Sequence, residues 1–85
     1  MQEFSYTIKD PKGIHARPAG IIVKKLREFS SAAVVIKGDD IVDLSKIMPF
    51  IGMDIAKGDK IIVRTEGPDE KECAEALKAA FRENL

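Results

Sequence analysis

The sequence lacks an excess of either charge and any long apolar run. Its 85 residues include 14 basic and 14 acidic ones, so the net charge is zero. A balanced chain has no overall field that would attract nucleic acid or an anionic membrane, and any basic function has to be local. No apolar run approaches the roughly 20 residues that span a bilayer, and no basic leader with an apolar core follows Met1. We therefore expect a cytoplasmic protein with no membrane insertion and no nucleic-acid partner.

Cysteine and aromatic residues are scarce as well. Cys73 is the one cysteine, so it has no partner for an internal disulfide, and no histidine or second cysteine lies near it in the sequence. We expect it to pack on the apolar side of a helix, and we predict no metal site and no cofactor. The chain has no Trp, and Phe and Tyr are absent from every predicted strand but the first. A sheet that stacks RNA bases on aromatic side chains is therefore not expected.

Hydrophobic periodicity predicts one domain that spans residues 1–85. Alternating apolar residues predict strands, and apolar residues spaced by three and four predict helices. The resulting order, βαββαβα, predicts an α+β fold: a two-layer open-faced sandwich with a four-stranded antiparallel sheet and its helices on one face. The expected elements are strands over Phe4–Ile8, Ala33–Ile36, Ile41–Leu44 and Lys60–Thr65, helices that start at Ala16 and near Asp69, and a short helical segment within Ser45–Asp54.

Two local patterns predict where helices start. Asp69 and Glu72 form an Asp-x-x-Glu capping pattern at the start of the last helix. Pro49 lacks a backbone N–H and disfavours helical geometry at Met48, so the short helical segment should start after Ser45.

The side of the sheet that faces away from the helices is predicted to be unusually apolar. The second and third strands form a hairpin around a turn at Gly38-Asp39-Asp40. By alternation, the free face receives Val34, Ile36, Ile41 and Ile62. An exposed apolar patch favours association, so we expect a monomer with weak self-association. A different strand register would bury the same residues instead.

The single histidine lies where the first strand gives way to the first helix, in Gly13-Ile14-His15-Ala16-Arg17-Pro18-Ala19. Pro18 is tolerated only in a first helical turn, which places the helix start just after His15. A helix start has unpaired N–H groups and the positive end of the macrodipole, both of which attract a dianion. Arg17 adds a local positive charge. His15 is thus a candidate phosphate carrier, and the alternative is a solvated surface histidine.

The Gly13–Ala19 segment, at this distance from the N-terminus, resembles HPr, the histidine-containing phosphocarrier family of the bacterial phosphoenolpyruvate-dependent sugar phosphotransferase system. The resemblance covers the whole chain and includes Val42–Met48, Ile55–Gly58 and Gly67–Glu70. It implies that phosphorylated enzyme I phosphorylates His15 on Nδ1, and that His15 passes the group to the enzyme IIA component of a sugar permease. The protein would then be a stoichiometric carrier rather than an enzyme.

The roles of the neighbouring residues follow from this chemistry. The backbone N–H groups of Ala16 and Arg17 would bind the phosphoryl oxygens. The Arg17 guanidinium would stabilise the charge spread over those oxygens in the transition state, the alternative being a solvated arginine at a helix end. Helix terminus and guanidinium together favour the neutral, nucleophilic imidazole. Gly13 would permit a close approach of the chain to the histidine loop.

A carrier also needs an exposed apolar surface near its histidine. The residues of the first helix that face the core leave one side of that helix exposed. Apolar residues of the short helical segment form a second exposed ridge beside it, and the resemblance assigns Phe50 to the core instead. The resemblance places an interface with enzyme I and enzyme IIA at Gly20, Ile21, Lys24, Arg27, Ile47, Met48 and Ile51. The alternative is that these are core residues of a small domain.

The chain departs from the family at two positions that bear on regulation and strain. Family members from Gram-positive bacteria have a kinase-phosphorylated serine before the Ile-Met pair, and here that position is Lys46. Ser45 precedes it, and we treat Ser45 as a hypothetical regulatory phosphosite. Asp54 stands where the family usually has glycine, which predicts mild strain in the turn after it.

Two other functions are compatible with the sequence. One is a regulatory or nitrogen-related paralogue of the same family, which the residues do not distinguish from a sugar-system carrier. The other is a small acylphosphatase-like hydrolase, which needs several backbone donors in one loop and a residue that positions water. The short turn at Gly13 supplies little of either, and Asp10 is the only carboxylate close to His15 in the sequence.

Overall fold

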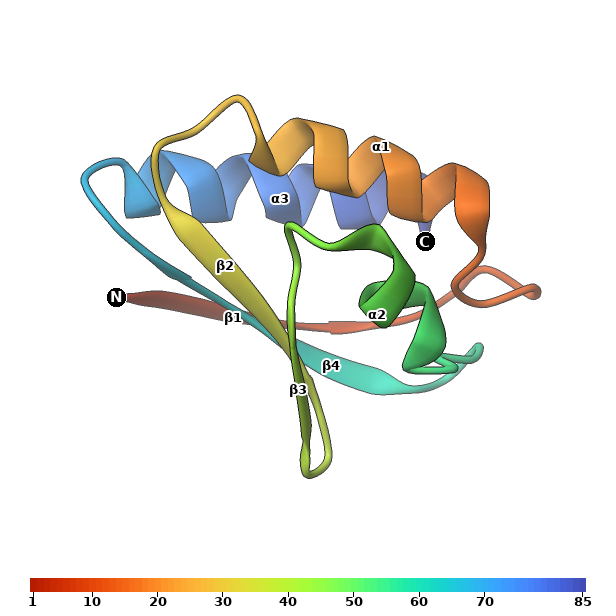
Figure 1. The fold of residues 1–85 in the computed structure, drawn as a ribbon. Coiled ribbons are helices and arrows are strands. Elements are labelled where there is room, and N and C mark those ends of the chain that lie inside the picture. Colours follow the sequence, from red (N-terminus) through yellow and green to blue (C-terminus); the bar gives the residue numbers. More distant parts are fainter.

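The computed structural model describes residues 1–85 as one antiparallel sheet and three helices (Figure 1). The sheet has the strand order β1-β4-β2-β3, with every neighbouring pair antiparallel. Helices α1 and α3 lie side by side over one face, and α2 packs against α1 and β3. The predicted fold class and element order are confirmed. The elements are β1 (Gln2–Thr7), α1 (Ala16–Leu26), β2 (Ala32–Lys37), β3 (Asp40–Asp43), α2 (Ile47–Gly52), β4 (Lys60–Glu66) and α3 (Glu70–Asn84).

The core lies between the sheet and the helices and is organised around Phe81 of α3. The ring of Phe81 meets Phe4 and Tyr6 from β1 and Phe50 from α2, with ring centroids 6.0–6.1 Å apart. Edge-to-face and tilted contacts of this kind stabilise aromatic pairs by more than the burial of their surface area alone. Phe50 is fully buried, as the resemblance implies. Its contact with Phe81 packs the short helix α2 against α3.

The opposite face of the sheet is the apolar open face that the alternation predicts. Ile36 pairs with Ile41 of β3 and with Ile62 of β4, and none of the three belongs to the buried core. The predicted register is therefore correct, and Ile41 is 60% exposed. The turn between β2 and β3 is one residue shorter than predicted, because Asp40 already pairs with Lys37.

The predicted capping pattern at the start of α3 is wrong. Asp69 is the N-cap residue, but its side chain makes no capping hydrogen bond. Its carboxylate instead accepts hydrogen bonds from the Ser31 hydroxyl at 2.5 Å and from the Ser30 N–H at 2.8 Å. These donors come from the loop before β2, about 38 residues away, so a pattern confined to residues 69–72 could not reveal them. The carboxylate thereby ties that loop to the start of α3.

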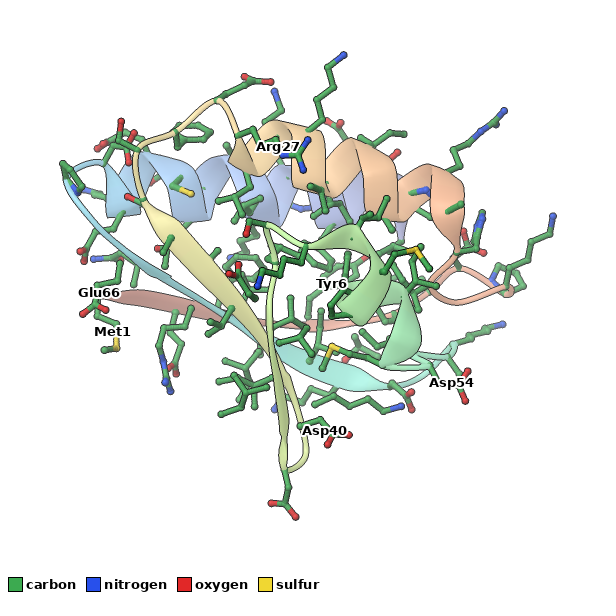
Figure 2. All side chains as sticks on the ribbon, in the orientation of Figure 1. Met1, Tyr6, Arg27, Asp40, Asp54 and Glu66 are labelled. Carbon is green, nitrogen blue, oxygen red and sulfur yellow. The ribbon has the colours of Figure 1, made fainter.

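Helix α2 starts at Ile47, with Lys46 as its N-cap residue, so the predicted start after Ser45 is confirmed. Pro49 is the third residue of the helix, where its missing N–H would have no partner within the helix. After the C-cap, Asp54 has a φ of 56° and is the one non-glycine residue with a positive φ. The predicted strain at this position is present, and Figure 2 shows Asp54 just beyond α2.

Cys73 packs in the core, as predicted. Its side chain is fully buried in α3, and burial raises the pKa of the thiol to about 11. The reactive thiolate form is therefore scarce near neutral pH. No group of three or more potential metal-ligating side chains occurs, and none of the helices has the length and apolar character needed to cross a membrane.

Candidate functional site

His15 stands at the junction between an anchored loop and helix α1. It is the N-cap residue of α1, with an extended backbone at φ −149° and ψ 178°. The loop before it is held against the segment that follows α2, since the Ile14 N–H donates to the Ile55 carbonyl at 2.8 Å. Gly13 has a φ of 64°, and a Cβ there would lie 2.3 Å from the Ile55 oxygen. The close approach predicted at Gly13 is therefore real, and it sets the position of the histidine.

Helix α1 begins with two N–H groups that have no partner in the protein. The first N–H of the helix to donate is that of Ala19, to the His15 carbonyl at 3.1 Å. Pro18 has no N–H, so the free groups are those of Ala16 and Arg17. The His15 side chain makes no capping hydrogen bond to any of them. Two free donors and the positive end of the helix dipole thus lie beside the imidazole, an arrangement that suits an anion.

The imidazole opens into a shallow surface pocket of about 320 Å³. Two cationic side chains, Lys12 and Arg17, border it together with a single carboxylate. The C-terminal end of α3 closes one side, and Figure 1 shows that end next to the start of α1. The sequence pointed to Arg17 but not to Lys12 or Asn84. The lining residues are Asp10, Pro11, Lys12, His15, Arg17, Pro18 and Asn84.

The carboxylate in this pocket faces the imidazole from the loop before α1. The Oδ2 atom of Asp10 lies 3.7 Å from Nε2 of His15, whose side chain is 38% exposed. The other oxygen, Oδ1, accepts the Lys12 N–H at 2.8 Å. In the sequence, Asp10 stands out only as the one carboxylate close to His15.

The residues predicted for a partner interface lie on one surface formed by α1 and α2, which we call the α1/α2 surface. Met48 is 71% exposed and Ile21 is 42% exposed, so these two are not core residues. Ile47 and Ile51 are partly buried against the core, and the Ile47 Cδ1 atom would lie 3.8 Å from a Cβ on Gly20. The two predicted ridges therefore meet. Lys24 and Arg27 are exposed along the same helix, and Figure 2 shows Arg27 at the C-terminal end of α1.

Ser45 is exposed just before α2, but its hydroxyl has a partner. It donates to Oδ1 of Asp43 at 2.7 Å, and the Ser45 N–H donates to the same oxygen at 2.9 Å. The side-chain and backbone hydrogen bonds from Ser45 lower the pKa of Asp43 and so favour its carboxylate form. The Ser45 carbonyl accepts a hydrogen bond from Arg27 at 3.4 Å. The segment before α2 is thus linked to α1.

Comparisons with known proteins agree on one family. The family model described as "PTS HPr component phosphorylation site" matches residues 2–83. The chain is 33% identical over 85 residues to the phosphocarrier protein HPr of Mycoplasma genitalium, covering 99% of this chain and 97% of that protein. It is 35% identical over 83 residues to HPr of Lysinibacillus sphaericus, with 98% and 94% covered.

The fold agrees with a solved structure to a similar degree. A histidine-containing phosphocarrier protein from Mycoplasma superposes with a TM-score of 0.92 at 32% sequence identity. The superposition covers 96% of this chain and 93% of that chain. Sequence and fold thus match over nearly the whole length.

Proposed function

This chain belongs to the HPr family of bacterial phosphotransferase systems, and from that membership we propose that His15 carries a phosphoryl group from enzyme I to enzyme IIA components of sugar permeases. The observation that supports the proposal is the setting of the imidazole. His15 stands at the start of α1 beside the free N–H groups of Ala16 and Arg17, in an open pocket with two cationic side chains.

The proposed chemistry uses the Nδ1 lone pair of a neutral imidazole as the nucleophile. Phosphoryl transfer passes through a loose, in-line transition state, with negative charge spread over the three equatorial oxygens. The N–H groups of Ala16 and Arg17 and the Arg17 guanidinium would stabilise that charge. The same donors suit the phosphorylated histidine afterwards, so the site needs no rearrangement between the two states.

We propose a carrier and not a hydrolase. Hydrolysis would need a group that positions a water molecule in line with the phosphorus atom. The one carboxylate in the pocket, Asp10, faces the far nitrogen of the ring and is held by the Lys12 N–H. The protein should therefore accumulate one phosphate per chain rather than release phosphate continuously.

Phosphorus NMR tests the proposal directly. The protein is mixed with phosphoenolpyruvate and enzyme I, and an acid-labile phosphoramidate signal is expected. His15→Ala should abolish the signal, whereas Lys78→Ala, which removes an exposed cation from α3, should retain it. Enzyme IIA proteins of the sugar and nitrogen branches are then added in turn. The sugar-system protein is expected to remove the phosphohistidine signal. No signal from the unmodified chain would refute the carrier function.

We further propose that partner proteins dock on the α1/α2 surface. Its exposed apolar side chains, Ile21 and Met48, are accompanied by the exposed cations Lys24 and Arg27. An apolar centre with a polar, charged rim is the usual composition of a transient interface. The surface uses the same helix whose first residue follows His15, so a docked partner would reach the imidazole.

We propose Ser45 as a regulatory phosphosite. Its hydrogen bonds show which contact a phosphorylation reaction would have to break. The hydroxyl would have to leave the Asp43 carboxylate, and a phosphate there would repel that carboxylate. Mass spectrometry after incubation with ATP and a kinase specific for HPr serines tests the site. Ser45→Ala is the control, and the absence of phosphoserine from the unmodified chain would remove the idea.

A further inference from the structure

The loop before α1 brings a carboxylate to the side of His15 that does not carry the phosphoryl group. We infer that Asp10 is a positioning residue for phosphoryl transfer, because its carboxylate keeps the imidazole proton on Nε2 and leaves the Nδ1 lone pair free. The inference rests on the proposed function and adds a residue to it. Its basis is the 3.7 Å approach of Asp10 Oδ2 to His15 Nε2 inside the pocket.

The carboxylate is held in place by its own loop. Oδ1 of Asp10 accepts the Lys12 N–H at 2.8 Å, and the Asp10 carbonyl accepts the Gly13 N–H at 2.9 Å. The Asp10 N–H donates to the Leu85 carbonyl at 2.8 Å. With one carboxylate oxygen and both backbone groups bound, the second oxygen is directed to His15. A side chain anchored in this way can orient another group at little cost in conformational entropy.

The tautomer of a neutral imidazole is set by what its two nitrogens face. One nitrogen carries the proton and donates, and the other has a lone pair and accepts. A carboxylate accepts hydrogen bonds and repels a lone pair, so Asp10 favours the proton on Nε2. Nδ1 is bonded to the ring carbon nearest the main chain, so it is the ring nitrogen closer to the backbone of His15, the N-cap residue of α1. In this tautomer the nucleophilic lone pair is on Nδ1, the nitrogen that does not face Asp10.

The same contact stabilises charge during transfer. As the Nδ1–P bond forms, the bond between phosphorus and its donor breaks, and its electron pair leaves with the donor. The ring becomes cationic, and the proton stays on Nε2 facing the Asp10 carboxylate. When the group is passed on, the Nδ1–P electron pair returns to the ring and Nε2 keeps its proton. The separation of 3.7 Å is longer than a hydrogen bond, and such contacts commonly shorten in the reacting complex.

The variant Asp10→Asn tests the inference because it keeps the hydrogen bond within the turn and replaces the acceptor that faces Nε2 with a donor. The amide oxygen can still accept the Lys12 N–H, which leaves the NH₂ group facing Nε2. An NH₂ donor favours a lone pair on Nε2 and places the proton on Nδ1, which blocks the nucleophile. Nitrogen-15 NMR of the unphosphorylated protein should show the proton mainly on Nε2 in the wild type and a shift toward Nδ1 in Asp10→Asn. Asp39→Asn, at the hairpin tip, should leave the tautomer unchanged.

The transfer rate gives the second readout. We expect Asp10→Asn to slow phosphorylation of His15 by roughly tenfold, by analogy with the lower end of the loss when the hydrogen-bond partner of a metal-ligating histidine is removed. Asp10→Ala has neither a donor nor an acceptor in its side chain, so its transfer rate should lie between those of wild type and Asp10→Asn. A wild-type protein with its proton mainly on Nδ1, or an Asp10→Asn variant with wild-type tautomer and rate, would overturn the inference. Failure of the carrier function would appear differently, as an absence of phosphohistidine with the predicted tautomer still present.

Discussion

At the scale of the residue, Arg17 is the side chain proposed to stabilise the negative charge of the transition state. It is exposed and lines the pocket of His15, and a substitution at such a position ordinarily changes the free energy of unfolding by less than about 0.5 kcal/mol. Arg17→Ala should therefore keep the fold and slow phosphoryl transfer by about 100-fold, the lower end of the loss when one donor to a transition-state oxygen is removed. Rapid-quench kinetics with phosphorylated enzyme I measures the rate.

The control for this prediction separates charge from geometry. Arg17→Lys retains the charge but loses the planar fork, so its rate should lie between those of Arg17→Ala and wild type. Lys78→Ala should transfer at the wild-type rate. A wild-type rate for Arg17→Ala would show that the guanidinium does not act on the transition state.

How far the site could be predicted depended on distance along the chain. His15, Arg17 and Pro18 are neighbours in the sequence, so the meaning of their spacing could be derived before any fold was known. Asn84 lines the same pocket from the other end of the chain, and only the packing of α3 beside α1 brings it there. Lys12 was within reach of the same reasoning, but a lysine in a turn is ordinarily solvated, and its type carries no specific signal.

At the scale of the element, the loop between β1 and α1 is positioned by contact with the segment after α2. Gly13→Ala would place a Cβ 2.3 Å from the Ile55 oxygen in a backbone of φ 64°. Positive φ alone costs an ordinary residue about 1–2 kcal/mol, and the collision should add to this and break the Ile14–Ile55 hydrogen bond. We expect a larger loss of unfolding free energy in urea titrations and slower phosphorylation of His15.

Gly38→Ala is the matched control for the loop. Gly38 has a similar φ of 60°, and nothing lies within 4 Å of a Cβ placed there. This variant should lose only the backbone contribution and transfer phosphate at the wild-type rate. Equal effects of the two substitutions on stability and rate would show that the contact at Ile55 does not position the histidine.

The start of α3 leads to a prediction about pH. Hydrogen bonds from the Ser31 hydroxyl and the Ser30 N–H lower the pKa of Asp69 below its ordinary value of 3.8. A carboxyl group with a lowered pKa in the folded state stabilises that state above its ordinary pKa, and the contribution is lost as pH falls through the lowered value. Asp69→Asn should therefore be less stable than wild type at pH 7.

The difference between the two proteins should shrink as the pH falls below about 3.8. Urea titrations at pH 7 and at pH 3 measure it, with Asp39→Asn as the control that should match wild type at both. A constant difference between Asp69→Asn and wild type across this range would show that ionisation of Asp69 is not the source.

The two helix starts explain why some elements were predictable in detail and others were not. The start of α2 follows from a steric property of Pro49, which acts whatever surrounds it, and the prediction was confirmed. At the start of α3, the Asp69 carboxylate could accept hydrogen bonds either from its own helix or from other segments. It accepts them from Ser30 and Ser31, in a loop distant in the sequence. Local sterics can be predicted from the sequence, whereas the choice among hydrogen-bond donors depends on which segments the fold brings together.

At the scale of the whole molecule, the protein has two apolar surfaces, one on the helices and one on the sheet. One is the α1/α2 surface, which includes the exposed side chains of Met48 and Ile21. The other is the open face of the sheet, where Ile36, Ile41 and Ile62 pair across three strands. We propose that transfer partners dock on the first surface and that weak self-association uses the second.

Two matched substitutions test this division, since each replaces an exposed apolar side chain by a charge. Met48→Glu should raise the KM for transfer from enzyme I by about tenfold, the effect of losing about 1.4 kcal/mol at an interface. Ile41→Glu should leave that KM unchanged and abolish any dimer seen by analytical ultracentrifugation at high protein concentration. Because neither side chain is buried, both variants should stay folded. An unchanged KM for Met48→Glu, or a raised one for Ile41→Glu, would move the docking site from the helices to the sheet.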